Sequence, residues 1–325
     1  MITGVGSYLP SNKFSNESLS NFVDTSDEWI SKRSGIKNRH FVAENEKTSD
    51  MAFFAANKAL ENAQISKNDI DLIVLATTTP DNTFPSTATL VQKKLEINAV
   101  SFDIQAVCAG FVFALSVAKS MMIEGMYKNC LVIGADSMSK LLDWKDRSTS
   151  VLFGDGAGAI ILQKFKNIES KYDDWGILSN IIHSDGQFYD LLKTTGGVSM
   201  SQKVGFIEME GKEVFKHAID KLSTSLDEAL KASNKKIDEL DWLVPHQANQ
   251  RIILAVADKM KIDVSKVIST VKDHGNTSAA SIPLALDNAI VSNKISNGNL
   301  IGLHAIGGGL SWGASIIRIG KPKIL

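Results

Sequence analysis

The sequence predicts an α/β protein made of two similar halves that share one core. Its 325 residues are 44% hydrophobic and 22% charged, which is ordinary for a globular protein with a large core. Buried, strand-like runs alternate with helix-like segments, and this alternation favours a parallel sheet with helices on its faces. Segments of the first half also recur in the second half at a nearly constant spacing, which indicates an internal duplication.

The first elements follow this pattern in order. Residues 2–8 predict a short strand, and a polar segment follows in which Thr25 or Ser26 is placed to cap a short helix. Residues 50–63 have helical periodicity, and residues 71–76 form an apolar run typical of a buried strand.

An apolar run over residues 106–118, broken only by Ser116, predicts a helix that is buried on every face. Cys108 would lie at its N-terminus, where free amide groups and the helix dipole favour a thiolate and lower the cysteine pKa. A free cysteine is more often a plain core residue, so its role as a nucleophile depends on the rest of the chain.

The duplication rests on three ungapped matches at an offset of 170. They pair residues 59–74 with 229–244, 103–109 with 273–279, and 129–135 with 299–305. A fourth match, of 154–159 with 309–314, has an offset of 155 and leaves about 139–153 as an insertion in the first half. We therefore expect halves at 1–170 and 171–325 with one shared core, since no low-complexity linker separates them.

The loops that follow the strands carry the chemistry. In open α/β sheets, ligands bind beyond the carboxyl ends of the strands. His246 follows a strand that ends at Pro245, Asn276 lies in the loop that matches the one before Cys108, and 307–309 is a run of three glycines. Each is unremarkable alone, as a loop residue, a helix cap and a turn. Together they supply a nucleophile, two side-chain donors and a free amide.

Composition excludes several other functions. The net charge of −1 and the pI near 6.6 argue against nucleic acid or an anionic membrane as a partner. Two cysteines cannot build a disulfide framework, and the first charged residue is Lys13, so the start lacks the basic residues of a signal peptide. No apolar run reaches the ~18 residues of a membrane span. We expect a soluble, cytoplasmic protein.

These motifs resemble β-ketoacyl-acyl carrier protein synthase III, of the thiolase superfamily. The resemblance rests on residues 108–111, 245–249, 275–281, 307–309 and 312–313, and it extends over nearly the whole chain. It implies a thiolase-like five-layer αβαβα fold built from two pseudo-symmetric halves, and a homodimer. The implied reaction is a decarboxylating Claisen condensation of acetyl-CoA with malonyl-acyl carrier protein, which begins fatty acid synthesis. Coenzyme A enters as the substrate thioester, and neither a further cofactor nor a metal is implied.

The resemblance also assigns catalytic roles. It implies that Cys108 takes the acyl group from CoA and that the amides of Cys108 and Gly308 stabilise the tetrahedral oxyanion. His246 and Asn276 would donate hydrogen bonds to the malonyl thioester carbonyl while carbon dioxide leaves.

A larger set of residues is implied for substrate binding. By the resemblance, Trp29 and Arg147 hold the adenine and Arg33 lies near a CoA phosphate. The CoA path would be lined by Thr25, Gly211, Phe215, Ala248 and Asn249, while Phe84 would reach across a dimer to close the partner's acyl pocket. The sequence departs from some relatives at Lys212 and Ile306, which puts CoA contacts and pocket shape in question.

A docking face for the carrier protein follows from helical spacing. Arg251 and Lys259 lie eight residues apart in a predicted helix over 250–260, so both charges share one face close to His246. A solvated charged face is the ordinary explanation. The acidic carrier protein implied by the resemblance favours docking, with Lys216 as a third contact.

Two other functions compete with this one. Enzymes of secondary metabolism that use CoA substrates alone, such as chalcone-type synthases, share the cysteine, histidine and asparagine. Hydroxymethylglutaryl-CoA synthases need a glutamate base that the sequence does not place. Non-catalytic partner subunits of paired ketosynthases lack the nucleophile, so Cys108 with His246 and Asn276 argues against that class.

Overall fold

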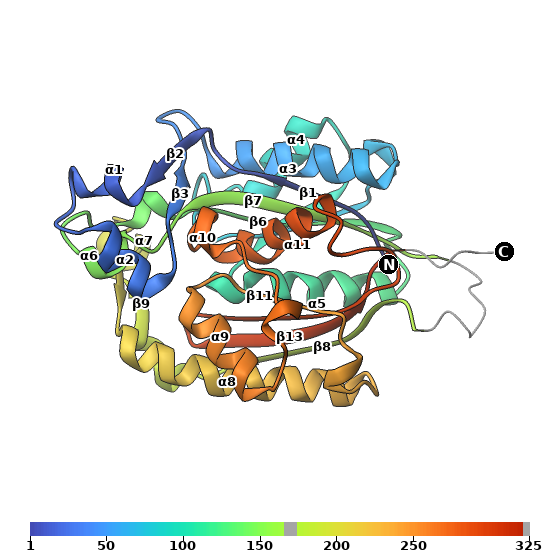
Figure 1. The fold of residues 1–325 in the computed structure, drawn as a ribbon. Helices are drawn as coiled ribbons and strands as arrows, with labels where there is room; N and C mark the ends of the chain where they lie inside the picture. The colour runs from blue at the N-terminus through green and yellow to red at the C-terminus, as the bar shows by residue number, and fades with distance from the viewer. Residues whose placement is uncertain (166–173, 321–325) are drawn as a thin grey trace.

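The computed structural model describes residues 1–165 and 174–320 and has five layers, in which helices alternate with two sheets (Figure 1). The five-layer arrangement implied by the resemblance is thereby confirmed. The expected boundary of the two halves, at 170 and 171, lies outside the described residues. Within these residues, no helix is both long and apolar enough to cross a membrane.

The first sheet has the strand order β1-β7-β6-β4-β5. Its strands are β1 (Ile2–Tyr8), β4 (Leu72–Ala76), β5 (Val100–Ile104), β6 (Asn129–Ser137) and β7 (Asp155–Gln163). Strand β4 runs parallel to β5 and β6, but β7 is antiparallel to both β6 and β1. The sheet is therefore mixed, and the prediction of a parallel sheet was wrong at this edge. An antiparallel neighbour needs no crossover helix, and the chain from β6 to β7 passes only through the predicted insertion.

The second sheet repeats this arrangement with the order β11-β12-β13-β8. Its strands are β8 (Gly176–Ser184), β11 (Trp242–Pro245), β12 (Leu300–Gly307) and β13 (Ser311–Arg318). Strands β11 and β12 are parallel, and β13 is antiparallel to β12 and β8. A single parallel bridge between Leu243 and Val267 takes the position of β5. The repeated order and directions support the predicted duplication.

Within the described residues, six helices form the other three layers (Figure 1). The outer layers are α3 (Thr48–Ala63) with α4 (Thr87–Leu95), and α8 (Gly211–Ala232) with α9 (Gln250–Lys259). Between the sheets lie α5 (Gly110–Ile123) and α11 (Ser281–Val291). Strand β4 shows why both faces of a sheet are apolar: Leu72 and Val74 pack toward α5, whereas Ile73 and Leu75 pack toward α3 and α4. A central position also explains why α5 is apolar all round.

The duplication is shifted by one residue relative to the predicted register. Leu72 and Trp242, the first residues of β4 and β11, pair with Cys130 and Ile301. The strands β6 and β12 are therefore offset by 171 rather than 170 residues. The same offset relates two 3₁₀ turns, η2 (Val107–Ala109) and η8 (Ser278–Ala280), each of which begins at a residue with positive φ. Cys108 thus corresponds to Ala279, and one extra residue lies between β11 and η8.

The remaining β-strands and α-helices of the described residues gather at one end of the layers (Figure 1, left). They are β2 (Asn12–Ser15), α1 (Asn16–Ser20), α2 (Asp27–Ser34), β3 (Asn38–Phe41), α6 (Arg147–Ser150), β9 (Leu192–Thr194), α7 (Val198–Ser201), β10 (Ile207–Met209) and α10 (Val271–His274). Ser26, rather than Thr25, caps α2, because its hydroxyl accepts the amide of Trp29 at 3.2 Å. The N-terminus lies at the opposite end (Figure 1). The end with these short elements is therefore the one where the loops concentrate.

Candidate active site

Two cavities meet at Cys108. The larger, of about 670 Å³, extends from Trp29 and Arg33 inward to Cys108. The smaller, of about 320 Å³, continues from Cys108 toward Tyr189 and Met200. Cys108, Phe153 and Leu192 line both cavities. A ligand group that enters through the first cavity therefore meets the sulfur before it can extend into the second.

Cys108 lies in the η2 turn, directly before α5 begins at Gly110. The helix thus starts four residues after the beginning of the apolar run at Ala106. The side chain is 4% exposed, and burial, with a smaller contribution from Asp136, raises the pKa of its thiol to about 12. The expectation of a lowered pKa was wrong, because loss of hydration outweighs the helix N-terminus. The resting nucleophile is therefore a thiol.

Gly307, the last residue of β12, lies against the backbone of the turn that carries Cys108. A Cβ atom at this position would lie 2.7 Å from both the Cys108 nitrogen and the Ala106 oxygen. Only glycine fits so close to backbone atoms. The next residue, Gly308, lines the smaller cavity beside Cys108, where its amide remains the predicted second oxyanion donor.

His246 follows β11 and lines the larger cavity together with Cys108. Its ring is 4% exposed, and burial, with a smaller effect of His304, lowers its pKa to about 3. The imidazole is therefore neutral. Its Nδ1 lies 2.6 Å from the hydroxyl oxygen of Ser281, so Nε2 is the nitrogen left for a ligand.

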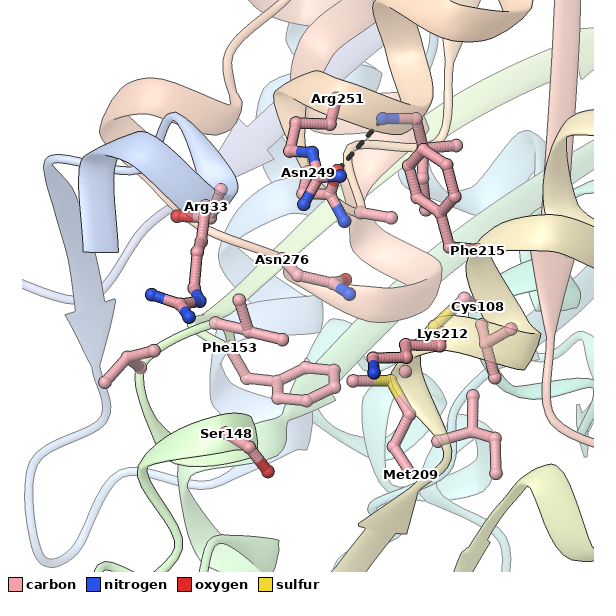
Figure 2. A pocket seen from close by; sticks show the side chains of 18 of the residues that line it. Arg33, Cys108, Ser148, Phe153, Met209, Lys212, Phe215, Asn249, Arg251 and Asn276 are labelled. Carbon is pink, nitrogen blue, oxygen red and sulfur yellow. Dashed lines mark hydrogen bonds between the residues drawn. The ribbon is translucent and has the colours of Figure 1, made fainter. Parts of the chain in front are cut away.

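Asn276 is oriented by its own side-chain oxygen. This oxygen accepts the amide of Ser278 at 2.9 Å, so the side-chain NH₂ group remains as a donor. The backbone is fixed as well, because the Asn276 nitrogen donates to the oxygen of Leu152 at 2.9 Å and its oxygen accepts from Gly154 at 3.0 Å. Figure 2 shows the side chain extending into the larger cavity.

The two halves are joined at the site by Asp136, which the sequence did not single out. This buried carboxylate, on β6, accepts the amide of Thr78 at 2.7 Å and the amide of Ala279, in η8, at 3.0 Å. It thereby holds the turn of the second half against the first half. No sequence motif marks such a contact, because the partners are 143 residues apart.

Trp29 and Arg147, expected at the adenine, lie together with Arg33. Trp29 and Arg33 line the larger cavity, whereas Arg147 lines neither cavity. The guanidinium carbons of Arg33 and Arg147 lie 4.2 Å and 5.0 Å from the ring centre of Trp29. Both are within the range of cation–π contacts. Arg147 also donates to the backbone oxygen of Asp24 at 3.0 Å. A base inserted between Trp29 and Arg147 would have to separate them.

The other predicted CoA residues divide into two groups. Those that line the larger cavity are Gly211, Phe215, Ala248 and Asn249, together with Lys212 and Ile306. Phe215, Asn249 and Lys212 are labelled in Figure 2. Asn249 also caps α9, since its side-chain oxygen accepts the Ile252 amide at 2.9 Å. Thr25 and Phe84 line neither cavity, and Phe84 is 83% exposed. Phe153, Leu152 and Met209 line the larger cavity without having been predicted.

The three cations expected to bind a carrier protein differ in their surroundings. Arg251 is exposed at the edge of the larger cavity and stacks on Phe215, with 5.1 Å between its guanidinium carbon and the ring centre. Lys216 is exposed on α8. Lys259 forms an ion pair of 2.9 Å with Asp220, which reduces its attraction for an acidic partner. Arg251 is therefore the strongest of the three candidates for contact with an acidic carrier protein.

A buried cysteine, a neutral histidine and an asparagine line one cavity between the two halves of a five-layer fold. This is the arrangement expected of a thiolase-like condensing enzyme. The described residues contain no group of three or more His, Cys, Asp or Glu side chains able to hold a metal ion.

Comparisons with known proteins narrow this class. A model of the 3-oxoacyl-[acyl-carrier-protein (ACP)] synthase III family matches residues 102–186, and the model of its C-terminal part matches 230–319. The β-ketoacyl-[acyl-carrier-protein] synthase III of Ehrlichia canis is 55% identical over 320 residues, 98% of this chain and 99% of the relative. That of Wolbachia pipientis wMel is 53% identical over 319 residues, 98% of each chain.

Similar solved structures agree with this family. The 3-oxoacyl-[acyl-carrier-protein] synthase III from Aquifex aeolicus is 44% identical with a TM-score of 0.91, covering 98% of this chain and 99% of that one. A priming β-ketosynthase from the R1128 polyketide pathway is 32% identical with a TM-score of 0.90, covering 98% and 96%. The chain therefore belongs to the β-ketoacyl-[acyl-carrier-protein] synthase III family and is an acyltransferase.

Proposed function

We propose that the protein condenses a short acyl-CoA, with acetyl-CoA as the main primer, and malonyl-acyl carrier protein to give a 3-oxoacyl-acyl carrier protein. This reaction initiates fatty acid synthesis in the cytoplasm. The observation that carries the proposal is the position of Cys108, where the donors His246 and Asn276 share a cavity with a buried thiol.

The first half-reaction transfers the acyl group. The Cys108 sulfur attacks the carbonyl carbon of the acyl-CoA thioester, the amides of Cys108 and Gly308 hold the tetrahedral oxyanion, and the bond to the CoA sulfur breaks. The thiol proton ends on that sulfur, so acyl-Cys108 and free CoA form with no net change of charge. Because burial raises the pKa of this thiol to about 12 and the thiolate is the attacking species, the proton must leave as the substrate binds.

The second half-reaction forms the carbon–carbon bond. The malonyl thioester loses carbon dioxide, and the electron pair of the broken bond is held as an enolate. The Nε2 of His246 and the side-chain NH₂ of Asn276 donate to the enolate oxygen. The enolate carbon attacks the acyl carbonyl on Cys108, and the cysteine sulfur leaves and takes a proton. Neutral donors in a buried cavity stabilise this charge strongly, because water does not screen them.

The mouth of the larger cavity suits a phosphorylated substrate. Its lining includes the cations Arg33, Lys212 and Arg251, and Trp29 offers a flat aromatic surface beside Arg147. Guanidinium groups bind phosphate oxygens with paired, charge-assisted hydrogen bonds. CoA and the phosphopantetheine arm of a carrier protein carry such phosphates. Arg251, with Lys216, would then contact the acidic carrier protein itself, and Lys259 would contribute less because Asp220 pairs with it.

A homodimer would complete the acyl pocket. Strand β5 lies at the edge of the first sheet, where its unpaired backbone groups can bond a second copy of the same strand, and its first residue, Val100, is 48% exposed. Phe84 is 83% exposed, and such an aromatic side chain is stabilised by burial against a partner. We propose that it closes the partner's smaller cavity and thereby limits primers to short chains.

Two other functions are less well supported. A CoA-only ketosynthase would leave Arg251 without a carrier protein to bind, and the relatives above 50% identity carry the name of the acyl carrier protein enzyme. A non-catalytic ketosynthase partner would not need a cysteine between two cavities.

The test is to identify the acylated cysteine and then the product. With acetyl-CoA, peptide mapping should find an acetyl group on Cys108 in the wild type and in Cys130→Ala, and none there in Cys108→Ala. Subsequent addition of malonyl-acyl carrier protein should yield a 3-oxobutyryl carrier protein and restore the free thiol. An acetyl group on Cys130, which is fully buried in β6, or the absence of condensation would refute the proposal.

A further inference from the structure

Ser281, the first residue of α11, lies behind the catalytic histidine. Its side chain is 1% exposed, and its hydroxyl oxygen is 2.6 Å from Nδ1 of His246. The same oxygen accepts a second hydrogen bond, of 3.3 Å, from the backbone amide of Gln247. The hydroxyl therefore joins the start of α11 to the loop that carries His246.

The direction of the first hydrogen bond follows from the partners of the hydroxyl. A serine hydroxyl has one hydrogen to donate and two lone pairs. The amide of Gln247 can only donate, so it uses a lone pair. Among the described residues, Nδ1 of His246 is the acceptor within hydrogen-bond distance of this hydroxyl. If Nδ1 carried the proton instead, the hydroxyl hydrogen would be buried without a partner, which is unfavourable.

We propose that Ser281 is a positioning residue that holds His246 in the tautomer with its hydrogen on Nε2. The proposal deepens the proposed function and rests on it, because that function requires Nε2 to donate to the malonyl thioester carbonyl. The opposite tautomer would present a lone pair to the developing enolate oxygen and repel it. The low pKa of His246 supports the argument, because a neutral imidazole carries a single ring N–H hydrogen, which can be on either nitrogen.

This role separates the two half-reactions. Acyl transfer to Cys108 uses backbone amides, so it does not depend on the tautomer of His246. Decarboxylation and condensation use the Nε2 hydrogen, so loss of the Ser281 hydroxyl should reduce kcat for malonyl decarboxylation and leave acyl transfer unchanged. The KM for malonyl-acyl carrier protein should change little, because the proposed docking residues Arg251 and Lys216 take no part in this hydrogen bond.

The test combines kinetics with nitrogen NMR. Ser281→Ala should lower kcat for decarboxylation about tenfold, as expected for one lost hydrogen bond to a catalytic group. Ser281→Thr, which keeps the hydroxyl, should recover most of that loss. Ser225→Ala is the matched control, since its buried hydroxyl donates to the backbone oxygen of Leu222 and, among the described residues, to no catalytic group. It should leave both half-reactions unchanged.

In ¹⁵N-histidine-labelled wild-type protein, the resonances that disappear in His246→Ala should show a protonated Nε2 and an unprotonated Nδ1. In Ser281→Ala, these resonances should shift toward a mixture of tautomers. A proton on Nδ1 in the wild type, unchanged decarboxylation in Ser281→Ala, or an equal loss of acyl transfer would overturn the proposal. A protonated Nε2 in an enzyme that cannot decarboxylate malonyl-acyl carrier protein would instead refute the proposed function.

Discussion

Replacing Gly307 by alanine should displace the nucleophile without removing any catalytic side chain. The added methyl group would start 2.7 Å from the Cys108 nitrogen and the Ala106 oxygen and 3.0 Å from the Ala109 nitrogen. Ordinary contacts begin at 3.4 Å. All three neighbours are backbone atoms of one turn, so no flexible side chain can move aside, and the turn itself must retreat.

The size of the effect follows from this distance. The shortfall is about 0.7 Å, and a misplacement of about 1 Å at a reacting group can cost ~100-fold in rate. We therefore expect Gly307→Ala to lower the rate of Cys108 acylation roughly 30-fold or more. The loss should appear in the acyl transfer step, because the sulfur and its amide move together away from the substrate.

The assay is the rate of acetyl transfer from acetyl-CoA, followed by intact mass, alongside the thermal midpoint of unfolding. Gly186→Ala is the matched control, because a Cβ atom there meets nothing within 4 Å. It should acylate at the wild-type rate. A Gly307→Ala protein that folds and acylates as fast as wild type would refute the close-packing argument, and one that fails to fold would show that the contact mainly maintains the structure.

Three further changes test the other parts of the site. His246→Ala and Asn276→Ala should each lower malonyl decarboxylation and condensation by about 10²–10³ while acyl transfer changes far less, and equal losses in all three assays would assign them another role. Arg251→Glu should weaken use of malonyl-acyl carrier protein more than acylation by acetyl-CoA and reduce its dependence on salt, whereas equal effects on both substrates would reject the docking face. Phe84→Ala should shift acylation toward longer or branched acyl-CoAs. A wild type that sediments as a monomer, or a variant with an unchanged chain-length preference, would refute the proposed role of Phe84.

Much of the fold was predictable from sequence because it depends on local periodicity. The strand β4 follows from a continuous apolar run that is typical of a strand buried on both faces, and the helix α3 follows from apolar residues that recur on one helical face. The duplication was visible, but its register was one residue off for β6 and β12. Sequence similarity alone cannot detect a single inserted residue in a loop, whereas strand pairing records it directly.

The grouping of the site residues was predictable from the sequence and their electrostatics were not, while their catalytic roles stay predictions. Cys108, His246 and Asn276 lie on loops that the duplication locates, and the structure places all three on one cavity. The pKa of Cys108 was predicted in the wrong direction, because a helix N-terminus is visible in the sequence while full burial is a property of the assembled core. Ser281 and Asp136 were missed as partners for the same reason, since their contacts cross between distant segments.

Burial explains why this site suits thioester condensation. It raises the pKa of Cys108 and lowers that of His246, so both groups are neutral before substrate arrives. Negative charge then develops only during the reaction, first on the tetrahedral oxyanion and then on the enolate. In the proposed reaction, a malonyl carboxylate brought into such a cavity loses its hydration, whereas the enolate formed as carbon dioxide leaves would be met by the proposed donors His246 and Asn276. The proposed site therefore stabilises negative charge on the enolate oxygen, where it promotes condensation, rather than on the malonyl carboxylate.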